Sequence, residues 1–260
     1  MSVFRNDKPF ARLLLAGVLT ALISPLSAGT SVAQDEKGVM DEKALSVLNQ
    51  MSDYLEKAQT ISFQTRTFLD IARESGINIK SGRQSEVFLK RPNHLNVSTL
   101  GDDGRDSEFW FDGKKFTYWR RDANEVMSLD FSGTTDKMLN HLLDDYDIQI
   151  PMSDLFYSNL DESFGEDGIL SAEYIGIRIV DGVKCHQLSF ESPGSDWQIW
   201  IEADSTPVPR RFVIDFVDDE SRPQYMSQMG SWSIDGEIED YQFSVVVPES
   251  VKRVELKKEE

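Results

Sequence analysis

The chain of 260 residues contains a single cysteine, Cys185. One thiol cannot form a disulfide within the chain, so the fold must depend on its hydrophobic core. Cys185 stands next to His186 in an expected strand, where adjacent side chains point to opposite faces, so the two are poorly placed to act as nucleophile and base. We therefore interpret Cys185 as a half-buried small residue rather than a reactive thiol.

Groups that perform catalysis or bind metals are also scarce. The three histidines, at positions 94, 141 and 186, lack the close His/Cys spacing of a zinc site. The sequence has no G-x-S-x-G motif and no glycine-rich phosphate loop before a helix. The acidic segments 101–106 and 144–147 lack the residue order of a calcium loop and the dry pocket of a catalytic carboxylate pair. We predict no enzyme activity, no metal and no cofactor; a hydrolase that uses Cys185 or His186 is the weakest alternative.

Positive charge is in short supply. The chain has 27 Lys and Arg residues against 45 Asp and Glu residues, which gives a formal net charge of −18. Such a surface repels phosphate backbones and anionic lipid head groups. This repulsion excludes nucleic acid as a partner. The same charge keeps copies of the chain apart, and we expect a monomer.

A hydrophobic run long enough to cross a membrane is not seen near the start of the chain. The apolar run at residues 13–23 has about half of the ~20 residues that a bilayer crossing needs, so we expect no permanent membrane span. Three basic residues precede this run and small residues follow it, which is the order of a secretory signal peptide. We assign residues 1–33 to this peptide, with cleavage after Ala33, and with Ala28 as the alternative site.

The exported part, residues 34–260, shows two periodicities. Residues 41–58 and 133–160 carry apolar side chains at helical spacing. The segments before and after the second helical region alternate apolar and polar residues, as strands do, and are linked by short turns. We predict a single α+β domain in which the first helix and a helical lid, inserted at about 133–160, cover a long, curved antiparallel sheet.

The alternation divides the strand residues between an inner and an outer face. The hairpin WFDGKKFTYW, residues 110–119, carries aromatic rings on both faces. Phe109, Phe111, Phe116 and Tyr118 share the inward parity. Five rings share the outward parity: Phe68, Phe88, Trp110, Trp119 and Trp200. Further along the chain, we expect Ile175, Ile177 and Ile179 to point inward, and a last short strand at residues 243–247.

Each face has two interpretations. The outward rings form cross-strand pairs under Lys and Arg stems, worth ~0.2–1 kcal/mol each, or they form a patch that docks another envelope protein. The inner face is a solid core, or it lines a cavity for an apolar ligand between sheet and helices. The residue pattern leaves these alternatives open.

Several segments together resemble a known family. They are the FDGK hairpin, YIGIRIVDGVKCHQLSF, DWQIWIEADSTPVPRRFVI and PQYMSQMGSW. From about residue 41 to 250 the chain is similar to a bacterial family of predicted periplasmic proteins, which is grouped with the lipoprotein carriers LolA and LolB. The resemblance implies an unclosed half-barrel of antiparallel strands with helices over its concave side. In the carriers, the acyl chains of a lipoprotein enter the space between sheet and helices.

The residues of this chain that would occupy the lining positions are identified by their expected place on the sheet. The resemblance implies twelve lining residues: Phe63, Leu89, Phe109, Phe111, Phe116, Tyr118, Leu142, Leu143, Trp197, Ile199, Phe212 and Ile214. We therefore expect a non-enzymatic periplasmic protein that binds an apolar or lipidated ligand, such as a lipoprotein acyl chain. The alternative is a protein-interaction module, an envelope sensor or assembly factor, that uses the outward rings and has no lipid cavity.

Overall fold

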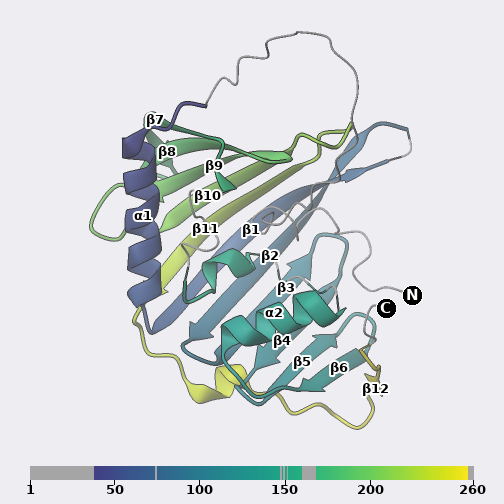
Figure 1. Cartoon of the computed structure of the whole chain (residues 1–260). Coiled ribbons are helices and arrows are strands. Elements are labelled where there is room, and N and C mark those ends of the chain that lie inside the picture. The colour runs from purple at the N-terminus through teal and green to yellow at the C-terminus, as the bar shows by residue number, and fades with distance from the viewer. Residues whose placement is uncertain are drawn as a thin grey trace, which may run out of the picture.

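The computed structural model describes residues 38–256 except for 74, 147, 149, 151 and 160–167 (Figure 1). The expected signal peptide, residues 1–33, lies outside the described residues. The helical elements are α1 (Glu42–Lys57), α2 (Thr135–Tyr146) and the 3-10 turns η2 (Ser153–Leu155) and η4 (Asp240–Phe243). The strands are β1 (Thr60–Ala72), β2 (Asn78–Lys90), β3 (His94–Gly101), β4 (Asp106–Phe111), β5 (Lys115–Arg120), β6 (Glu125–Asp130), β7 (Ser171–Val180), β8 (Val183–Ser192), β9 (Ser195–Glu202), β10 (Pro209–Phe216), β11 (Gln224–Ile234) and β12 (Lys252–Arg253).

These strands form one sheet of 12 strands in the order β12-β6-β5-β4-β3-β2-β1-β11-β10-β9-β8-β7. Neighbouring strands pair antiparallel, except that the short β12 runs parallel to β6. The strands at the two ends of this order, β7 and β12, do not pair with each other, so the sheet is unclosed. The predicted fold class, an unclosed antiparallel sheet with helices, is confirmed.

Two meanders make up the sheet. Strands β1–β6 follow one another through short turns, and so do β7–β11. In the turn between β4 and β5, Asp112 Oδ1 accepts hydrogen bonds from the backbone N–H groups of Lys114 and Lys115 at 2.9 and 2.8 Å, and Gly113 has φ +83°. An Asx turn followed by a left-handed glycine reverses the chain at low cost. The pairing of β1 with β11 joins the two meanders.

Helix α1 forms where the sequence predicts it. Asp41 caps its first turn, because Asp41 Oδ1 accepts a hydrogen bond from the Lys43 N–H at 2.8 Å. Acidic Glu42 in the first turn and basic Lys57 in the last turn suit the helix dipole. Its buried face consists of Ala44, Val47, Leu48, Met51, Ser52 and Leu55. This face lies on β7, β8 and β9, at one end of the sheet (Figure 1).

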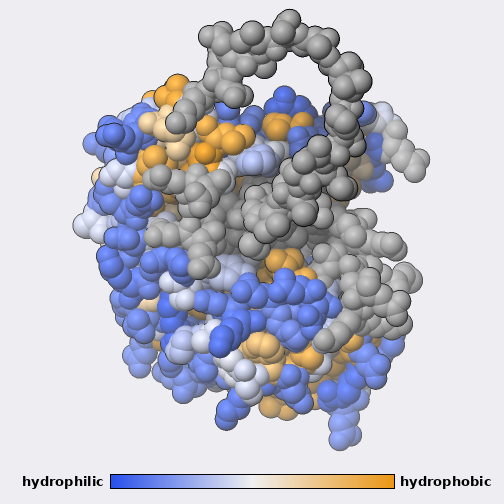
Figure 2. Space-filling model, in the orientation of Figure 1, coloured by the Kyte–Doolittle hydropathy of each residue, from blue (hydrophilic) through white to orange (hydrophobic). Residues whose placement is uncertain are grey.

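Helix α2 is the main element of the predicted lid region. Its buried residues include Met138, Leu139 and Leu142, which belong to the core cluster. Its outward residues are hydrophilic, and Figure 2 shows hydrophobic surface on either side of them. The helix is therefore amphipathic and faces the sheet with its apolar side.

The last expected strand, at residues 243–247, is wrong. Asp240–Phe243 forms η4, and residues 244–248 that follow are in no strand. Phe243 is 1% exposed, and its ring meets His94 at 5.1 Å between centroids, so it anchors the segment against β3 rather than at a sheet edge. The strand near this end of the chain is β12, which adds to β6.

Ile177 and Ile179 point to the concave face as expected, because they pair with His186 and Lys184 on the inward parity of β8, but they are not buried there. The register of β7 on β8 shifts between Tyr174 and Gly176, and Gly176 has φ +127°. A bulge adds a residue to one strand, so the inward parity changes from Tyr174 before it to Ile177 and Ile179 after it. Beyond it, Ile177 and Ile179 are 46% and 70% exposed.

Candidate functional site

Strand register aligns the inward side chains in rows that cross the concave face. The first row consists of Phe63, Val87, Val97 and Phe109 on β1–β4. The second row consists of Ile61, Leu89, Leu95, Phe111 and Phe116 on β1–β5. None of these nine side chains is more than 6% exposed. The first meander therefore presents a continuous apolar block to the helices.

The twelve predicted lining residues come together around this block. Nine are buried members of one core cluster: Phe63, Leu89, Phe109, Phe111, Phe116, Leu142, Trp197, Ile199 and Ile214. Tyr118 and Phe212 are partly buried and pack against the cluster, and Leu143 is half-buried on α2. Their role as a ligand lining stays a prediction, whereas their gathering on one face is observed.

Two further aromatic residues lie in the middle of this face. Phe63 stacks on Trp232 with 4.3 Å between ring centroids, and Phe156 lies 6.4 Å from Phe63. Strict alternation from Met229 would place Trp232 on the outer face. The β1–β11 register shifts next to Gln64, and Ser231 has φ +54°, which turns Trp232 inward. The sequence analysis missed both residues, and the glycine at position 230 is the one local signal of this irregularity.

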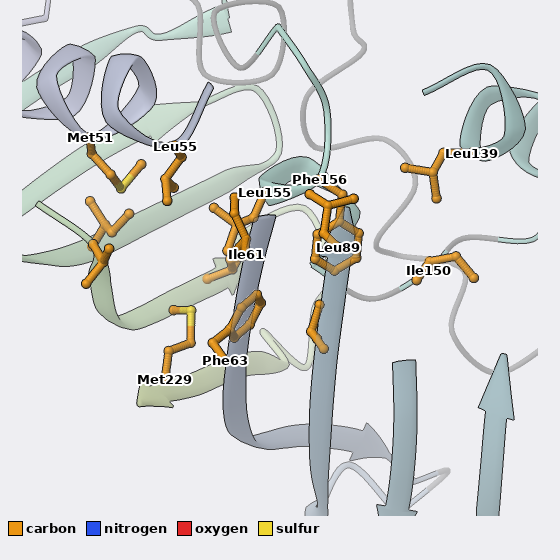
Figure 3. Packing of buried hydrophobic residues seen from close by; sticks show 14 of the residues in the cluster. Met51, Leu55, Ile61, Phe63, Leu89, Leu139, Ile150, Leu155, Phe156 and Met229 are labelled. Carbon is orange, nitrogen blue, oxygen red and sulfur yellow. The ribbon is translucent and has the colours of Figure 1, made fainter. Parts of the chain in front are cut away.

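The turn η2 lies over the centre of the concave face, between the two helices. In Figure 3 Leu155 and Phe156 point toward Ile61 and Leu89, with α1 residues on one side and Leu139 of α2 on the other. Leu155 of η2 and Phe156, which follows it, are both buried in the core cluster. The covering layer therefore consists of α1, η2 and α2 in that order across the sheet.

Arg91, in the turn after β2, fixes η2 in this place. Its Nη1 and Nη2 atoms donate to the carbonyl oxygens of Phe156 and Tyr157, each at 2.9 Å, and its Nε donates to Ala58 O at 3.2 Å. Burial lowers the pKa of Arg91, and the nearby carboxylates of Asp136 and Glu56 act in the opposite direction. One guanidinium thus ties the end of α1 to the lid.

The lid is also tied to the sheet at the start of α2. The Thr135 N–H donates to Pro92 O at 2.9 Å, and the Gly133 N–H donates to Gly113 O at 3.2 Å. On α2, the His141 ring stacks at 4.9 Å on Phe131, which lies 6.1 Å from Phe111 of β4. These contacts hold α2 at the β4 end of the face, far from α1 (Figure 1).

The convex face carries the outward rings in separate places. Arg121 lies over the rings of Trp110 and Trp119 at 5.6 and 5.4 Å, and its Nη2 donates to Glu108 Oε2 at 2.5 Å. Trp110 is 6% exposed. Trp200 is 9% exposed, and Arg211 lies over its ring at 5.4 Å. These are the covered cross-strand rings of the first interpretation.

Phe68, Phe88 and Trp119 are half-buried on the same face. Trp110 on β4 and Trp200 on β9 are separated by five strands, β3, β2, β1, β11 and β10. The five rings therefore do not share one location. Their use in docking a partner stays a prediction.

Cys185 lies in a small second cluster on the convex face, with Trp200, Val180 and Val213. It is fully buried, and burial, followed by the nearby carboxylate of Glu202, raises the pKa of its thiol to about 11. His186 points to the other face, where its Nδ1 lies 2.9 Å from the Tyr174 hydroxyl. His186 is therefore hydrogen-bonded on the face opposite to the thiol. The thiol is not arranged as a nucleophile.

A family profile described as "Predicted periplasmic protein (DUF2092)" matches residues 44–257. The chain belongs to this family. The match confirms both the resemblance seen in the sequence and the expected periplasmic location. Within the described residues, none of the helices has the length and hydropathy that a bilayer crossing requires. No curated protein matches the sequence.

Several solved structures are similar to the chain. The lipoprotein LppX of Mycobacterium tuberculosis has a TM-score of 0.47 at 14% identity, over 80% of this chain and 100% of that one. A LolA superfamily protein from Nitrosomonas europaea has a TM-score of 0.38 at 10% identity, over 78% of this chain and 97% of that one. The MucA/MucB complex of Pseudomonas aeruginosa has a TM-score of 0.41 at 13% identity, over 78% of this chain and 61% of that one.

The role of Arg91 can be tested with Arg91→Met, which keeps an apolar stem and removes three donors. We expect the free energy of unfolding to fall by about 2 kcal/mol or more, because carbonyl oxygens lose charged hydrogen-bond partners. Amide hydrogen exchange should become faster in residues 153–157. Lys90→Met is the matched control, since the Lys90–Asp240 ion pair is largely exposed. Unchanged exchange in residues 153–157 of Arg91→Met would show that the guanidinium does not fix η2.

The thiol of Cys185 should resist alkylation in the folded protein. With a pKa of about 11, only about one thiol in a thousand is ionised at pH 8. Iodoacetamide at pH 8, followed by mass spectrometry, should therefore leave the native chain unlabelled and label the urea-unfolded chain. Labelling should accelerate as the pH rises toward 11. Fast labelling of the native chain at pH 8 would contradict the assignment.

Proposed function

We propose that the protein binds an apolar or lipidated ligand in the periplasm and performs no covalent chemistry on it. The hydrocarbon part of the ligand lies on the concave face, between α1 and α2. The observation that supports this proposal most strongly is the continuous apolar block of the first meander, which the second meander extends through Trp197, Ile199 and Ile214.

The proportions of the two layers favour a ligand between them. The eleven strands from β6 to β7 span about 48 Å at ~4.8 Å per strand. A helix with its side chains is about 10 Å across, so α1 and α2 by themselves cover less than half of this width. A three-residue turn, η2, stands between them. The centre of the face, whose apolar side chains are buried, is therefore covered by a short turn rather than by a helix.

Burial of hydrocarbon provides enough free energy for such binding. Each CH₂ group removed from water is worth about 0.8 kcal/mol, so an alkyl chain gains several kcal/mol without any hydrogen bond to the protein. Ordering of the ligand and of the lid offsets part of this gain. Binding of this kind needs surface and shape rather than a catalytic group.

The five tryptophans offer a direct test, because they divide between the two faces. Trp197 and Trp232 pack in the concave cluster, whereas Trp110, Trp119 and Trp200 lie on the convex face. A brominated alkyl chain quenches the fluorescence of rings that it touches. We expect it to quench the triple variant Trp110→Phe, Trp119→Phe and Trp200→Phe, which keeps the concave pair. The double variant Trp197→Phe and Trp232→Phe should not be quenched.

Circular dichroism shows whether both variants keep the fold. Quenching restricted to the convex rings would contradict the proposal and favour the interaction module. Absence of quenching in both variants at a saturating concentration of the brominated alkyl compound would contradict ligand binding on the concave face.

A further inference from the structure

Hydroxyl side chains form the next rows of the concave face. One row consists of Thr65, Ser85, Thr99 and Ser107 on β1–β4, two residues along each strand from the apolar row of Phe63. The row beyond it consists of Ser227, Thr67 and Arg83 on β11, β1 and β2. Rows of one face are ~6.8 Å apart. The face therefore changes from apolar to polar over a short distance along the strands.

Three of these hydroxyls form a buried cluster. Thr65 Oγ1 lies 2.7 Å from Ser227 Oγ, and Thr67 Oγ1 lies 3.1 Å from both of these oxygens. None of the three side chains is more than 7% exposed. A hydroxyl has one hydrogen to donate and two lone pairs. When Thr65 donates to Ser227 and Ser227 donates to Thr67, the Thr67 hydrogen closes the ring on Thr65, and it can turn instead to an acceptor on a ligand.

Arg83 stands beside this cluster, directly across from Thr67 in the β1–β2 register. It shares the inward parity of Val87 and Leu89 along β2, and it is half-buried. Between residues 38 and 256, within the described positions, Arg83 makes no ion pair or hydrogen bond. Arg120, on the same face, is in contrast neutralised by Asp122 and Glu125 at 3.8 and 3.7 Å. A half-buried guanidinium without a carboxylate is a site for an anionic group.

We propose that Arg83 and Thr67, supported by Ser227 and Thr65, bind the anionic head group of an amphiphile whose alkyl chain lies on the apolar rows. The inference rests on the proposed function and names its ligand class: a carboxylate or a phosphate monoester attached to hydrocarbon. The guanidinium supplies two parallel donors and Thr67 supplies a third. The path from Thr67 to Phe63 along β1 covers about 13 Å.

The acidic character of the chain does not oppose this site at short range. A net charge of −18 repels anions at a distance, but ions at physiological strength screen this repulsion beyond about 8 Å. Contact with a half-buried guanidinium is screened much less. The same contrast makes anion binding specific to Arg83 rather than general to the surface.

Competition with a neutral dye tests binding of the ligand's head group separately from binding of its alkyl chain. The full chain is loaded with N-phenylnaphthylamine, which is then displaced by decanoate, decyl phosphate or decanol. Arg83→Gln should weaken binding of one or both anionic competitors about tenfold and that of decanol less than twofold. The anion with the larger loss identifies the head group. Arg66→Gln, which removes an exposed charge from the convex face of β1, should change none of the three.

Thr67→Val removes the hydroxyl at nearly constant side-chain volume and provides a second test. It should weaken binding of the same anionic competitor. Equal displacement by all three competitors, unaffected by Arg83→Gln, would overturn the head-group site and leave the proposed function in place. Failure of all three to displace the dye from the wild-type chain would overturn the proposed function itself. Decanol affinity also reports whether each variant keeps its folded face.

Discussion

The pairing of β1 with β11 is the interaction on which the concave face depends. Residues 61–69 of β1 meet residues 225–234 of β11, and this register joins two meanders into one sheet. Without it, the apolar rows on β1–β5 would stop at an exposed edge of β1. With it, α1 and α2 cover opposite ends of a single face, and Phe63 meets Trp232 at its centre. The shape of the candidate site is thus a consequence of a long-range strand pair.

The two faces of the sheet have different physical roles. On the concave side, apolar rows are followed along the strands by rows of hydroxyls and then by Arg83. This order matches the division of an amphiphile into an alkyl tail and a polar head group. On the convex side, arginine stems cover the tryptophan rings, and the thiol of Cys185 is buried beside Trp200. The aromatic hairpin at residues 110–119 needs both environments, because its rings alternate between the faces.

Local patterns were sufficient for much of this arrangement. Helical spacing predicts α1 and α2, and alternation predicts the inward rings of β4 and β5, because each of these signals arises within one element. The position of Trp232 follows from the irregularity at Ser231, where alternation fails, whereas Ile177 faces inward and is exposed on the edge strand β7. The contacts of Arg91 with Phe156 and the hydroxyl cluster join residues far apart in the chain, so they appear only once register and lid are placed.

The central claim is that hydrocarbon occupies part of the concave face in the native protein. Native mass spectrometry of the chain, purified from a periplasm without detergent, tests this claim most directly. We expect a mass excess that organic extraction removes, and an extract that contains an amphiphile with an alkyl chain. A chain that carries its bare mass, with no amphiphile in the extract and none taken up on incubation with decanoate or decanol, would contradict it.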